Sequence, residues 1–248
     1  MPTIWRVGGY VRDRILGLES NDIDFTFVLD DTSKTVEEGF KEMTDWLVAN
    51  EYQIFLSTPD MYTIRAKFPK SHKFAGTTAD FVLSRKEVGY VENTRRPILE
   101  LGDLYDDLLR RDFTVNAMAL DEDDNVIDPC GGIDDLQYLG VGILKTPLPA
   151  HVTMLDDPLR LLRAMRFSIT KGFTISHEII KSLKNPEILE KLEKVVSSER
   201  IREELYKMMK HDTIKTVEMI VHFDTLLPGF SRIVFGNGLW LKPTFEKK

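Results

Sequence analysis

The sequence predicts an α+β protein in which a mixed head of about 140 residues is followed by an all-helical segment. The first half of the chain alternates short runs of strand-forming residues with helical runs. From Asp157 to Leu227 nearly every stretch has helical spacing of apolar residues, and the chain shows no internal repeat. A chain of 248 residues is long enough for one large domain or two modest ones with a core.

Five strands are predicted in the head. Runs rich in β-branched and aromatic residues predict them, at 4–7, 22–29, 52–57, 62–68 and 78–84. The stretch that follows, 85–101, is polar and basic with few regular signals, so it predicts a long loop.

Helical signals stand between and after these strands. Two adjacent glycines open residues 8–17, which predict a turn and a short helix. Residues 34–49 have apolar side chains at helical spacing, and either Thr32 or Ser33 is the expected cap. Residues 106–139 predict mixed helix and hairpin.

Two carboxylates, Asp22 and Asp24, stand on either side of one isoleucine, just beyond the glycine turn. Successive side chains of a strand point to opposite faces, so these two share one face. Neighbouring carboxylates repel unless a cation or a proton lies between them. The pair therefore indicates a cation site, although the motif alone also fits a turn or an exposed strand start.

The composition is that of an ordinary globular protein, with 42% hydrophobic and 29% charged residues. There is no 18-residue apolar run, and the N-terminus lacks the basic and hydrophobic regions of a signal peptide. The lone Cys130 excludes an internal disulfide and is typical of a reducing compartment, so we expect a cytoplasmic protein. The histidines show no metal-ligand spacing with that cysteine, and no zinc site is predicted.

Charge is unevenly distributed along the chain. The net charge of −7 argues against a general nucleic-acid coat protein. Residues 158–210, however, carry 12 Lys and Arg against 7 Asp and Glu. A basic helical segment beside an acidic head suits an enzyme that touches RNA locally, while charge alone fits a solvated helical face equally well.

Five motifs occur in a particular order between residues 6 and 205. They read GGYVRDRILGLESNDID, LLRRDFTVNAMAL, DPCGGIDDL, DDPLRLLRAMRF and SSERIREEL. In this order they resemble the class II tRNA nucleotidyltransferases and bacterial poly(A) polymerases, a branch of the polymerase-β-like superfamily that includes CCA-adding enzymes. The resemblance implies a polymerase-β-like nucleotidyltransferase head at 1–142, an all-α neck for base recognition at 143–212, and a short C-terminal segment at 213–248.

The resemblance also implies a Mg²⁺-dependent reaction in which an RNA 3′-hydroxyl attacks the α-phosphorus of a nucleoside triphosphate. Asp22 and Asp24 are then the metal ligands, and their hard oxygens suit Mg²⁺. Asp80 stands where the family brings another carboxylate near the metal, but the family more often has Glu there, followed by Thr-Phe-Arg. Asp80 is therefore either a third catalytic residue or a strand-edge residue.

In the family, the glycine turn holds the triphosphate. Gly8 and Gly9 can expose backbone N–H groups at a helix start, where anions are favoured. Arg12 follows on the next helix and is a further candidate for phosphate contact. The alternatives are a plain tight turn for the glycines and local pairing with Asp13 for the arginine.

The motif around residue 111 implies recognition of the sugar. Arg110 and Arg111 offer planar guanidinium groups suited to phosphate. By resemblance, Asp112 accepts a hydrogen bond from the ribose 2′-hydroxyl with the help of Arg111, which selects ribonucleotides. Asn116, one turn later on an apolar helix, positions this unit. An N-terminal helix cap at Asp112 is compatible with that contact.

Base selection is assigned to the start of the predicted neck. Pro158 fits a first helical turn, which makes Asp157 the expected N-cap. Arg160 lies three residues later on the same helical face, beside Asp157. In the family, a Glu-Asp-x-x-Arg motif reads cytosine or adenine by Watson–Crick-like hydrogen bonds without a nucleic-acid template, and here Asp replaces its Glu.

Further arginines follow on the same predicted helix and in the last motif. Arg163 and Arg166 follow Arg160 at intervals of three residues. They are expected to contact nucleotide phosphate or RNA, unless they are only solvated helix charges. Arg200 and Arg202 are expected to buttress the neck helices.

The leading hypothesis is an enzyme that adds CMP and AMP, from CTP and ATP, to the 3′ end of tRNA, as a monomer or weak dimer with no DNA or membrane partner. Typical family members continue through body and tail domains that grip the tRNA, and this sequence ends before them. An A-adding or poly(A)-polymerase-like enzyme is the alternative, because Asp157 and Arg160 serve both bases. An inactive RNA-binding module is a third hypothesis, against which the intact Asp22 and Asp24 argue.

Overall fold

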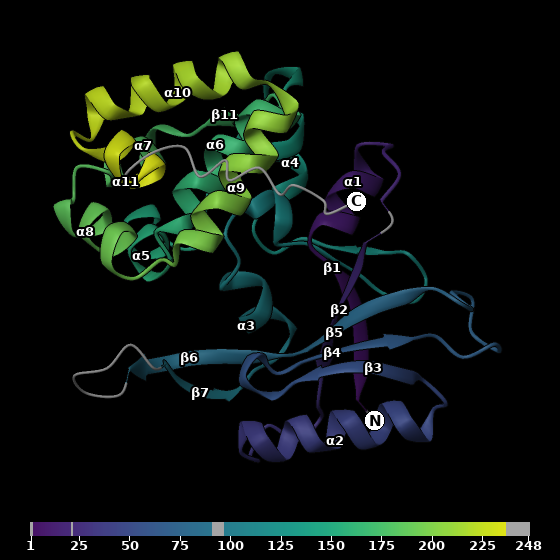
Figure 1. Ribbon diagram of the computed structural model, residues 1–248. Helices are drawn as coiled ribbons and strands as arrows, with labels where there is room; N and C mark the ends of the chain where they lie inside the picture. The colour runs from purple at the N-terminus through teal and green to yellow at the C-terminus, as the bar shows by residue number, and fades with distance from the viewer. Residues whose placement is uncertain (1, 21, 91–96, 237–248) are drawn as a thin grey trace, which may run out of the picture. The chain divides into compact units, whose positions relative to one another are not determined.

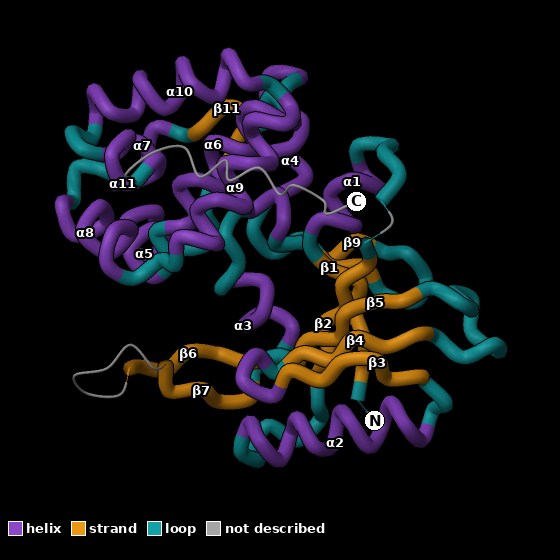
Figure 2. The backbone as a smooth tube through the Cα atoms, in the orientation of Figure 1, coloured by secondary structure: helices purple, strands orange, loops and turns teal. Residues whose placement is uncertain are grey.

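The computed structural model describes residues 2–20, 22–90 and 97–236 (Figure 1). The chain divides into two compact units, Met1–Leu136 and Gln137–Lys248. The first combines a sheet with helices and the second is mainly helical, as the colours of Figure 2 show. The predicted α+β fold class is confirmed, while domain boundaries after residues 142 and 212 stay a prediction.

The N-terminal unit is built on a seven-stranded sheet in the order β3-β4-β5-β2-β1-β8-β9. Only the central β2–β5 pair is parallel, and the other neighbours are antiparallel. All five predicted strands are present. The strands of the unit are β1 (Thr3–Val7), β2 (Ile23–Val28), β3 (Gln53–Thr58), β4 (Thr63–Lys67), β5 (Thr78–Leu83), β6 (Arg85–Tyr90), β7 (Pro97–Leu101), β8 (Ala119–Leu120) and β9 (Val126–Ile127). Its helices are α1 (Gly9–Ile15), α2 (Val36–Ala49), α3 (Leu104–Leu109) and α4 (Gly132–Gln137), with short 3₁₀ turns η1 (Pro59–Met61) and η2 (Thr114–Asn116).

Alternation along β2 decides which face of the sheet is apolar. Phe25 and Phe27 point to one face, where Phe25 stacks on Phe81 of β5 with ring centroids 5.2 Å apart. Met43 and Leu47 of α2 are buried in the same cluster. Helix α2 therefore covers this face and forms the main core of the unit.

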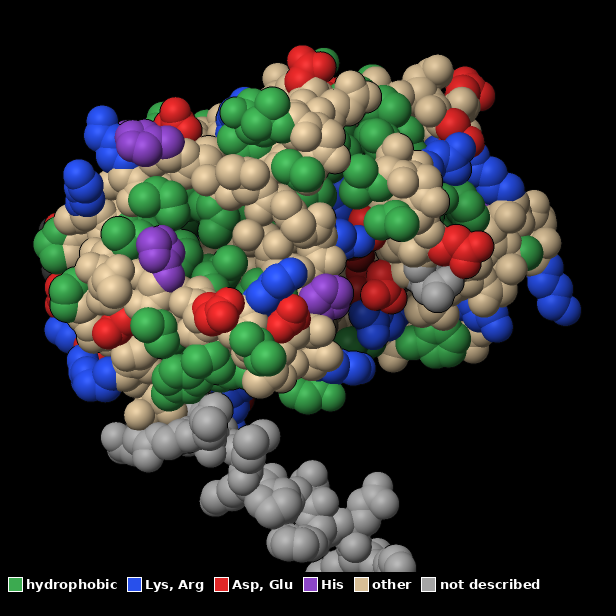
Figure 3. All heavy atoms as spheres, turned by 90° about the horizontal axis from the view of Figure 1, so that it is seen from above, with side chains coloured by type: hydrophobic (Ala, Val, Ile, Leu, Met, Phe, Trp, Pro, Cys, Tyr) green, Lys and Arg blue, Asp and Glu red, His purple; other side chains and the backbone are tan. Residues whose placement is uncertain are grey.

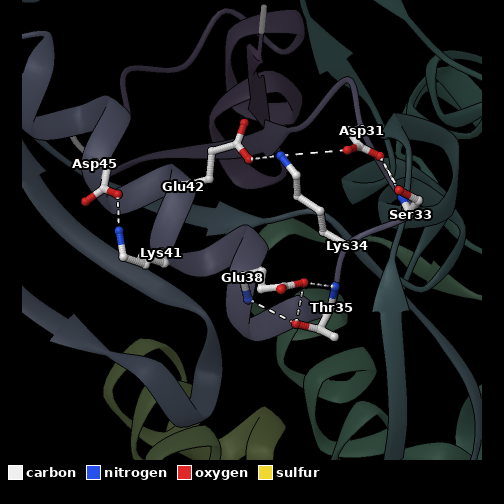
Figure 4. Close-up of polar contacts among 8 residues, drawn as sticks. All are labelled: Asp31, Ser33, Lys34, Thr35, Glu38, Lys41, Glu42 and Asp45. Carbon is white, nitrogen blue, oxygen red and sulfur yellow. Dashed lines mark hydrogen bonds and ion pairs between the residues drawn. The ribbon is translucent and has the colours of Figure 1, made fainter.

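Helix α2 begins two residues later than the sequence indicates. Thr35, not Thr32 or Ser33, is the N-cap: its hydroxyl accepts a hydrogen bond from Glu38 N at 3.2 Å, and the Glu38 carboxylate accepts one from Thr35 N at 2.9 Å (Figure 4). This reciprocal pair satisfies two backbone donors, which neither upstream residue can match. The cap prediction is wrong by two or three residues.

The opposite face of β2 carries polar side chains. Thr26 donates a hydrogen bond to Asp107 of α3 at 2.6 Å, so α3 lies over this face. Asp24 is two residues earlier on the same face. Helix α3 thus contacts this face at Thr26. Asp24 lies nearer the N-terminal end of β2.

Two further sequence predictions in the head are wrong. Residues 85–101, predicted as a loop, contain the antiparallel pair β6–β7, which includes an ion pair between Lys86 and Glu100. This ribbon exposes Ile98 and buries Leu101, so its composition lacks a clean alternation. Around Asn116 the predicted helix is a single 3₁₀ turn that leads into β8. That turn brings Asn116 back toward α1 instead of along a helix axis.

The C-terminal unit is a set of helices with one short parallel strand pair, β10–β11. Helices α6 and α9 pack closely, and Leu162, Met165 and Met208 are fully buried between the helices of the unit. Apolar and charged side chains are interspersed on the surface seen in Figure 3. The elements are η3 (Tyr138–Gly140), β10 (Ile143–Leu144), α5 (Ala150–Asp156), α6 (Leu159–Lys171), β11 (Thr174–Ile175), α7 (His177–Ser182), α8 (Pro186–Lys194), α9 (Ser198–His211), α10 (Thr213–Leu226) and α11 (Phe230–Phe235).

Candidate functional site

One row of in-register residues crosses the centre of the N-terminal sheet. Asp24 of β2 stands opposite Asp80 of β5, and Asp80 stands opposite Arg65 of β4. Val7 of β1 flanks Asp24 on the other side. Side chains directly opposite one another point to the same face, so the sheet gathers three charged groups there. Sequence reasoning found the two aspartates but not Arg65, whose position depends on strand register.

The electrostatics around Asp24 favour a cation. Burial raises the pKa of this carboxyl above its ordinary value, Arg111 opposes the shift, and the nearby carboxylates of Asp80 and Asp22 add to it. Among the described residues, no three His, Cys, Asp or Glu side chains form a ready-made metal cluster. Mg²⁺ commonly binds through one or two carboxylates together with substrate phosphates, and Asp22 with Asp24 fits that chemistry.

An open pocket of about 540 Å³ lies at this end of the sheet. Its lining is mostly polar or charged, and every lining residue belongs to the N-terminal unit. The residues are Asp22, Ile23, Asp24, Arg65, Thr77, Thr78, Ala79 and Asp80. The three candidate catalytic aspartates therefore share one cavity.

Gly8 directly follows β1, which flanks Asp24 on the side away from β5. Its φ is +72°, and a Cβ added there would stand 2.9 Å from Nη1 of Arg111 and 3.9 Å from Oδ2 of Asp24. Any larger residue would be strained and would displace the guanidinium. The structure thus brings together Gly8, Arg111 and Asp24, which are far apart in the sequence. Gly9 lies beside Arg12, whose Nη2 would be 3.4 Å from an added Cβ.

Asp107 is a site residue that the sequence analysis missed. It is fully buried, and its carboxylate accepts hydrogen bonds from Arg111 at 2.7 Å and from Thr26 at 2.6 Å, with a further ion pair to Arg110. Burial alone would raise its pKa, but the two arginines and the hydroxyl together hold the pKa well below its ordinary value. Its position four residues before Arg111, the spacing of neighbours on a helix, is the sequence signal that could have identified it.

The residues assigned to sugar recognition form a second buried network. Nη1 of Arg12 donates to Oδ1 of Asn116 at 2.6 Å, and Nδ2 of Asn116 donates to Oδ1 of Asp112 at 3.0 Å. Arg12 also pairs with Asp13 through two hydrogen bonds of 2.8 and 2.9 Å. The Asp112 carboxylate accepts from Phe113 N, and the following 3₁₀ turn begins after Phe113. Asp112 is therefore not the predicted helix cap.

In the C-terminal unit, Asp157 has an extended backbone and Oδ1 accepts from Leu159 N at 3.2 Å, so it satisfies a donor in the first turn of α6. Its other oxygen forms an ion pair of 2.8 Å with Arg200 of α9. Nη1 of Arg160 donates to the carbonyl of Thr153 at 3.0 Å. Arg200 thus ties the start of α9 to the start of α6, which agrees with its expected buttressing role.

Arg166 is engaged inside the helical unit. Its guanidinium pairs with Glu204 of α9, which is 4% exposed, and lies 4.2 Å from the ring centroid of Phe167. Arg163 lies 3.7 Å from the same carboxylate and retains 34% side-chain exposure. Both arginines help to hold α6 against α9, and their expected contact with nucleotide or RNA stays a prediction.

The candidate residues therefore fall into two groups. The N-terminal unit holds the aspartates, the glycine turn and the sugar network, and the C-terminal unit holds the residues assigned to base selection. Residues 4–141 match the family described as the poly(A) polymerase head domain, and the chain belongs to this family. More particularly, it is a member of the class II tRNA nucleotidyltransferases that the five motifs resemble.

Several of its curated relatives are named as CCA or tRNA nucleotidyltransferase proteins. The chain is 34% identical to the mitochondrial CCA tRNA nucleotidyltransferase of Candida glabrata, over 84% of this chain and 39% of that protein. It is also 34% identical to the tRNA nucleotidyltransferase cca1 of Schizosaccharomyces pombe (89% and 44%) and to the multifunctional CCA protein of Neisseria gonorrhoeae (86% and 46%). The chain thus spans about two fifths to one half of the length of these relatives.

Solved structures give the same relationship. A tRNA nucleotidyltransferase complexed with a primer tRNA and an incoming ATP analogue matches with a TM-score of 0.65 and 26% identity, over 92% of this chain and 60% of that one. A CCA-adding enzyme with CTP matches with a TM-score of 0.66 and 26% identity, over 94% and 48%. In the described part of the chain, no helix is long and apolar enough to cross a membrane. The predicted cytoplasmic location stays a prediction, since one relative is named mitochondrial.

Proposed function

We propose that this protein is a Mg²⁺-dependent, template-independent nucleotidyltransferase that adds CMP and AMP, from CTP and ATP, to the 3′ end of tRNA. The observation that carries the proposal is the convergence of Gly8, Arg111 and Asp24 at one end of the sheet, with Asp22 and Asp80 in the adjoining pocket. A metal site next to a glycine turn and the guanidinium of Arg111 suits the negative charge of a triphosphate. The relatives and the two solved structures support the choice of nucleotides and acceptor.

In this proposal the residues of the N-terminal unit have separate tasks. The backbone at Gly8 and Gly9 and the guanidinium of Arg111 bind the triphosphate. Asp22 and Asp24 hold Mg²⁺, which when bound stabilises the charge of the departing pyrophosphate and activates the attacking oxygen. Asp112, held by Asn116, accepts a hydrogen bond from the ribose 2′-hydroxyl. Arg12 contributes by fixing Asn116.

Selection of the base is assigned to the helical neck, at 143–212. Asp157 and Arg160 supply an acceptor and a donor for the Watson–Crick edge of cytosine or adenine, and Arg163 supplies a half-exposed cation for phosphate or RNA. Arg166 supports the packing of this helix through Glu204. No nucleic-acid template is required.

An adenosine-adding or poly(A)-polymerase-like enzyme is the second candidate, because the matching family is described as a poly(A) polymerase head domain. The two candidates share the same head chemistry and differ only in the nucleotides added and in when addition stops. Product sequence therefore separates them, and mutation of the shared aspartates does not.

The test is nucleotide incorporation with Mg²⁺, offering CTP, ATP, UTP and GTP separately and together. The acceptors are tRNA lacking CCA, tRNA ending in CC, and an unrelated oligoribonucleotide. We expect C, C and A to be added to tRNA, followed by a stop. Adenosine added only after CC, or without limit, would instead establish the second candidate. No incorporation on any acceptor would contradict both.

The metal assignment needs a matched pair of double variants. Replacing Asp22 and Asp24 by alanine should lower incorporation roughly 1,000-fold or more, because ligands of a catalytic metal are worth several kcal/mol. Replacing the exposed Asp45 and Asp60 by alanine is the control, since it removes the same charge away from the pocket. Equal activity of the two double variants would rule out the assigned metal site.

A further inference from the structure

Arg65 places a positive charge beside three carboxylates in the open pocket. It donates to both oxygens of Asp80, from Nε at 2.7 Å and from Nη2 at 2.6 Å. Its side chain is 55% exposed and that of Asp80 is 27% exposed. Among the residues that the structure describes, Nη1 of Arg65 has no hydrogen-bond partner. The edge of the guanidinium that carries Nη1 can therefore donate hydrogen bonds to an anion.

The geometry of this pair is set by the sheet. Arg65 and Asp80 are directly opposite each other on β4 and β5, and a bidentate contact leaves the guanidinium little rotational freedom. An isolated surface ion pair would add little to stability. Here the pair lines the pocket together with Asp22 and Asp24, where an arginine held in one orientation can recognise a ligand.

The position of Arg65 along the row indicates which ligand it meets. Gly8 and Arg111 lie on the β1 side of Asp24, and Asp80 and Arg65 lie on the β5 and β4 side. Strand spacing puts the backbone of Arg65 about 10 Å from that of Asp24. In phosphoryl transfer the attacking oxygen and the leaving oxygen are roughly in line across the phosphorus. With pyrophosphate leaving toward Gly8, the attacking oxygen arrives from the side of Asp80 and Arg65.

We infer that Arg65 binds a backbone phosphate of the acceptor RNA next to its attacking 3′-hydroxyl, and that Asp80 acts as a positioning residue that holds Arg65 and does not bind the metal. The inference rests on the proposed function, because it takes the triphosphate to lie at Gly8. It assigns the open side of the pocket to RNA and revises the part that the family resemblance gives to Asp80.

The first test measures binding of an oligoribonucleotide ending in CC, with EDTA present so that no metal or chemistry contributes. Arg65→Gln should weaken binding roughly 5- to 20-fold, as expected for loss of one partly exposed charged contact. The slope of log K against log salt should become shallower by about 0.7, the value for one phosphate of a single strand. Lys41→Gln, an exposed cation on α2, is the matched control and should change neither quantity.

The second test is a double-variant cycle in the incorporation assay. Arg65→Gln should raise the acceptor KM and leave the KM for CTP and ATP unchanged. Asp80→Asn should do the same to a smaller extent, with an unchanged Mg²⁺ requirement. The double variant should be no worse than Arg65→Gln alone, because two residues acting through one contact are not additive. Melting temperatures of all variants check that they fold.

Each contrary result is specific. A raised nucleotide KM with unchanged RNA binding would assign Arg65 to the triphosphate and overturn the inference. A raised Mg²⁺ requirement in Asp80→Asn would make Asp80 a metal ligand and also overturn it. If wild type incorporates nothing but Arg65→Gln still weakens RNA binding, the proposed function fails and the RNA contact stands. If wild type is active and Arg65→Gln behaves like Lys41→Gln, only the RNA contact fails.

Discussion

The two sides of Asp24 are built differently. On the side of β1 and α3, which we call the buried side, the charged groups are enclosed and pair with one another; its members are Arg12, Asp107, Arg111, Asp112 and Asn116. On the side of β5 and β4, the open side, the charges line the open pocket; its members are Asp22, Asp80 and Arg65.

The two sides differ in how their charges are stabilised. Buried charges must be paired and hydrogen-bonded, or they cost several kcal/mol each, so the buried side is fixed by the protein's own contacts. Exposed carboxylates can stay close together because water screens them, and a cation or phosphate can replace that water. The buried side is therefore held by internal contacts, whereas the open side leaves an accessible pocket.

Asp107→Asn should break the buried side and produce the largest loss of stability. Without the carboxylate charge, Arg110 and Arg111 lose their enclosed counter-ion, and we expect the free energy of unfolding to fall by about 3–5 kcal/mol. Urea unfolding at pH 7 measures it. Asp106→Asn, in the exposed capping box of the same helix, should cost only about 1 kcal/mol.

The pH dependence of Asp107 gives an independent check. Its folded-state pKa lies below the ordinary value of 3.8, so its stabilisation is present above about pH 4 and is lost as the pH falls through that lower value. The stability difference between wild type and Asp107→Asn should therefore shrink on acidification below pH 4. A difference that stays constant down to pH 2 would contradict a paired carboxylate.

Gly8→Ala tests the boundary between the two sides, with Gly17→Ala as its control. Both glycines have a φ near +70°, so each substitution is strained, and the strain should be greater at Gly8, whose ψ of −135° lies outside the left-handed helical region. Only at Gly8 does the new methyl group meet Arg111, whereas nothing lies within 4 Å at Gly17. We expect Gly8→Ala alone to lower kcat/KM for nucleotide on the order of tenfold or more. Equal kinetics in the two variants would mean that Arg111 has no part in binding.

Asp112→Ala tests whether the buried side also touches substrate. Loss of a hydrogen bond from the ribose 2′-hydroxyl should reduce the preference for ATP over dATP by roughly tenfold. The ratio of the two kcat/KM values measures this and is insensitive to a general loss of folded protein. Asp134→Ala, an exposed aspartate of α4, should leave the ratio unchanged. A purely structural Asp112 would lower both rates equally.

The smallest expected change in the free energy of unfolding is that of Asp24→Asn, at the edge of the open side. Because its folded-state pKa is raised, ionising it costs stability as the pH rises above about 4. Asp24→Asn should therefore gain stability relative to wild type as the pH rises from about 4 toward the raised pKa of Asp24, and Mg²⁺ should stabilise wild type more than the variant. Unfolding curves at several pH values, with Asp45→Asn as control, measure both effects. A gap that narrows with pH would contradict the raised pKa.

Much of the open side could be predicted from local pattern. The period of two in a strand predicts that Asp22 and Asp24 share a face, and both line the pocket, although β2 itself begins at Ile23. Asp80 was found only through the family resemblance, and Arg65 not at all. Their meeting depends on the register of β4 against β5, and a shift of one residue would turn Arg65 to the other face.

For the buried side, the sequence identified several of the residues but did not predict which residues contact one another. Arg111 and Asp112 were recognised from their motif, whereas Asp107 was missed and the turn at Asn116 was expected to be a helix. A 3₁₀ turn there lets Asn116 bond both Arg12 and Asp112, and the bond to Arg12 joins segments that are 104 residues apart. Such long-range bonds outweigh the weak local preference for helix.

By itself, the sequence determined the fold class, five strands of the head and the family, because periodicity and motifs are local properties of a chain. The tertiary structure decided what each charge faces. Arg65 with Asp80 and Arg166 with Glu204 are pairings fixed by strand register and by helix packing, respectively. The energy of a charge depends on its burial and its neighbours, and both exist only once the chain has folded.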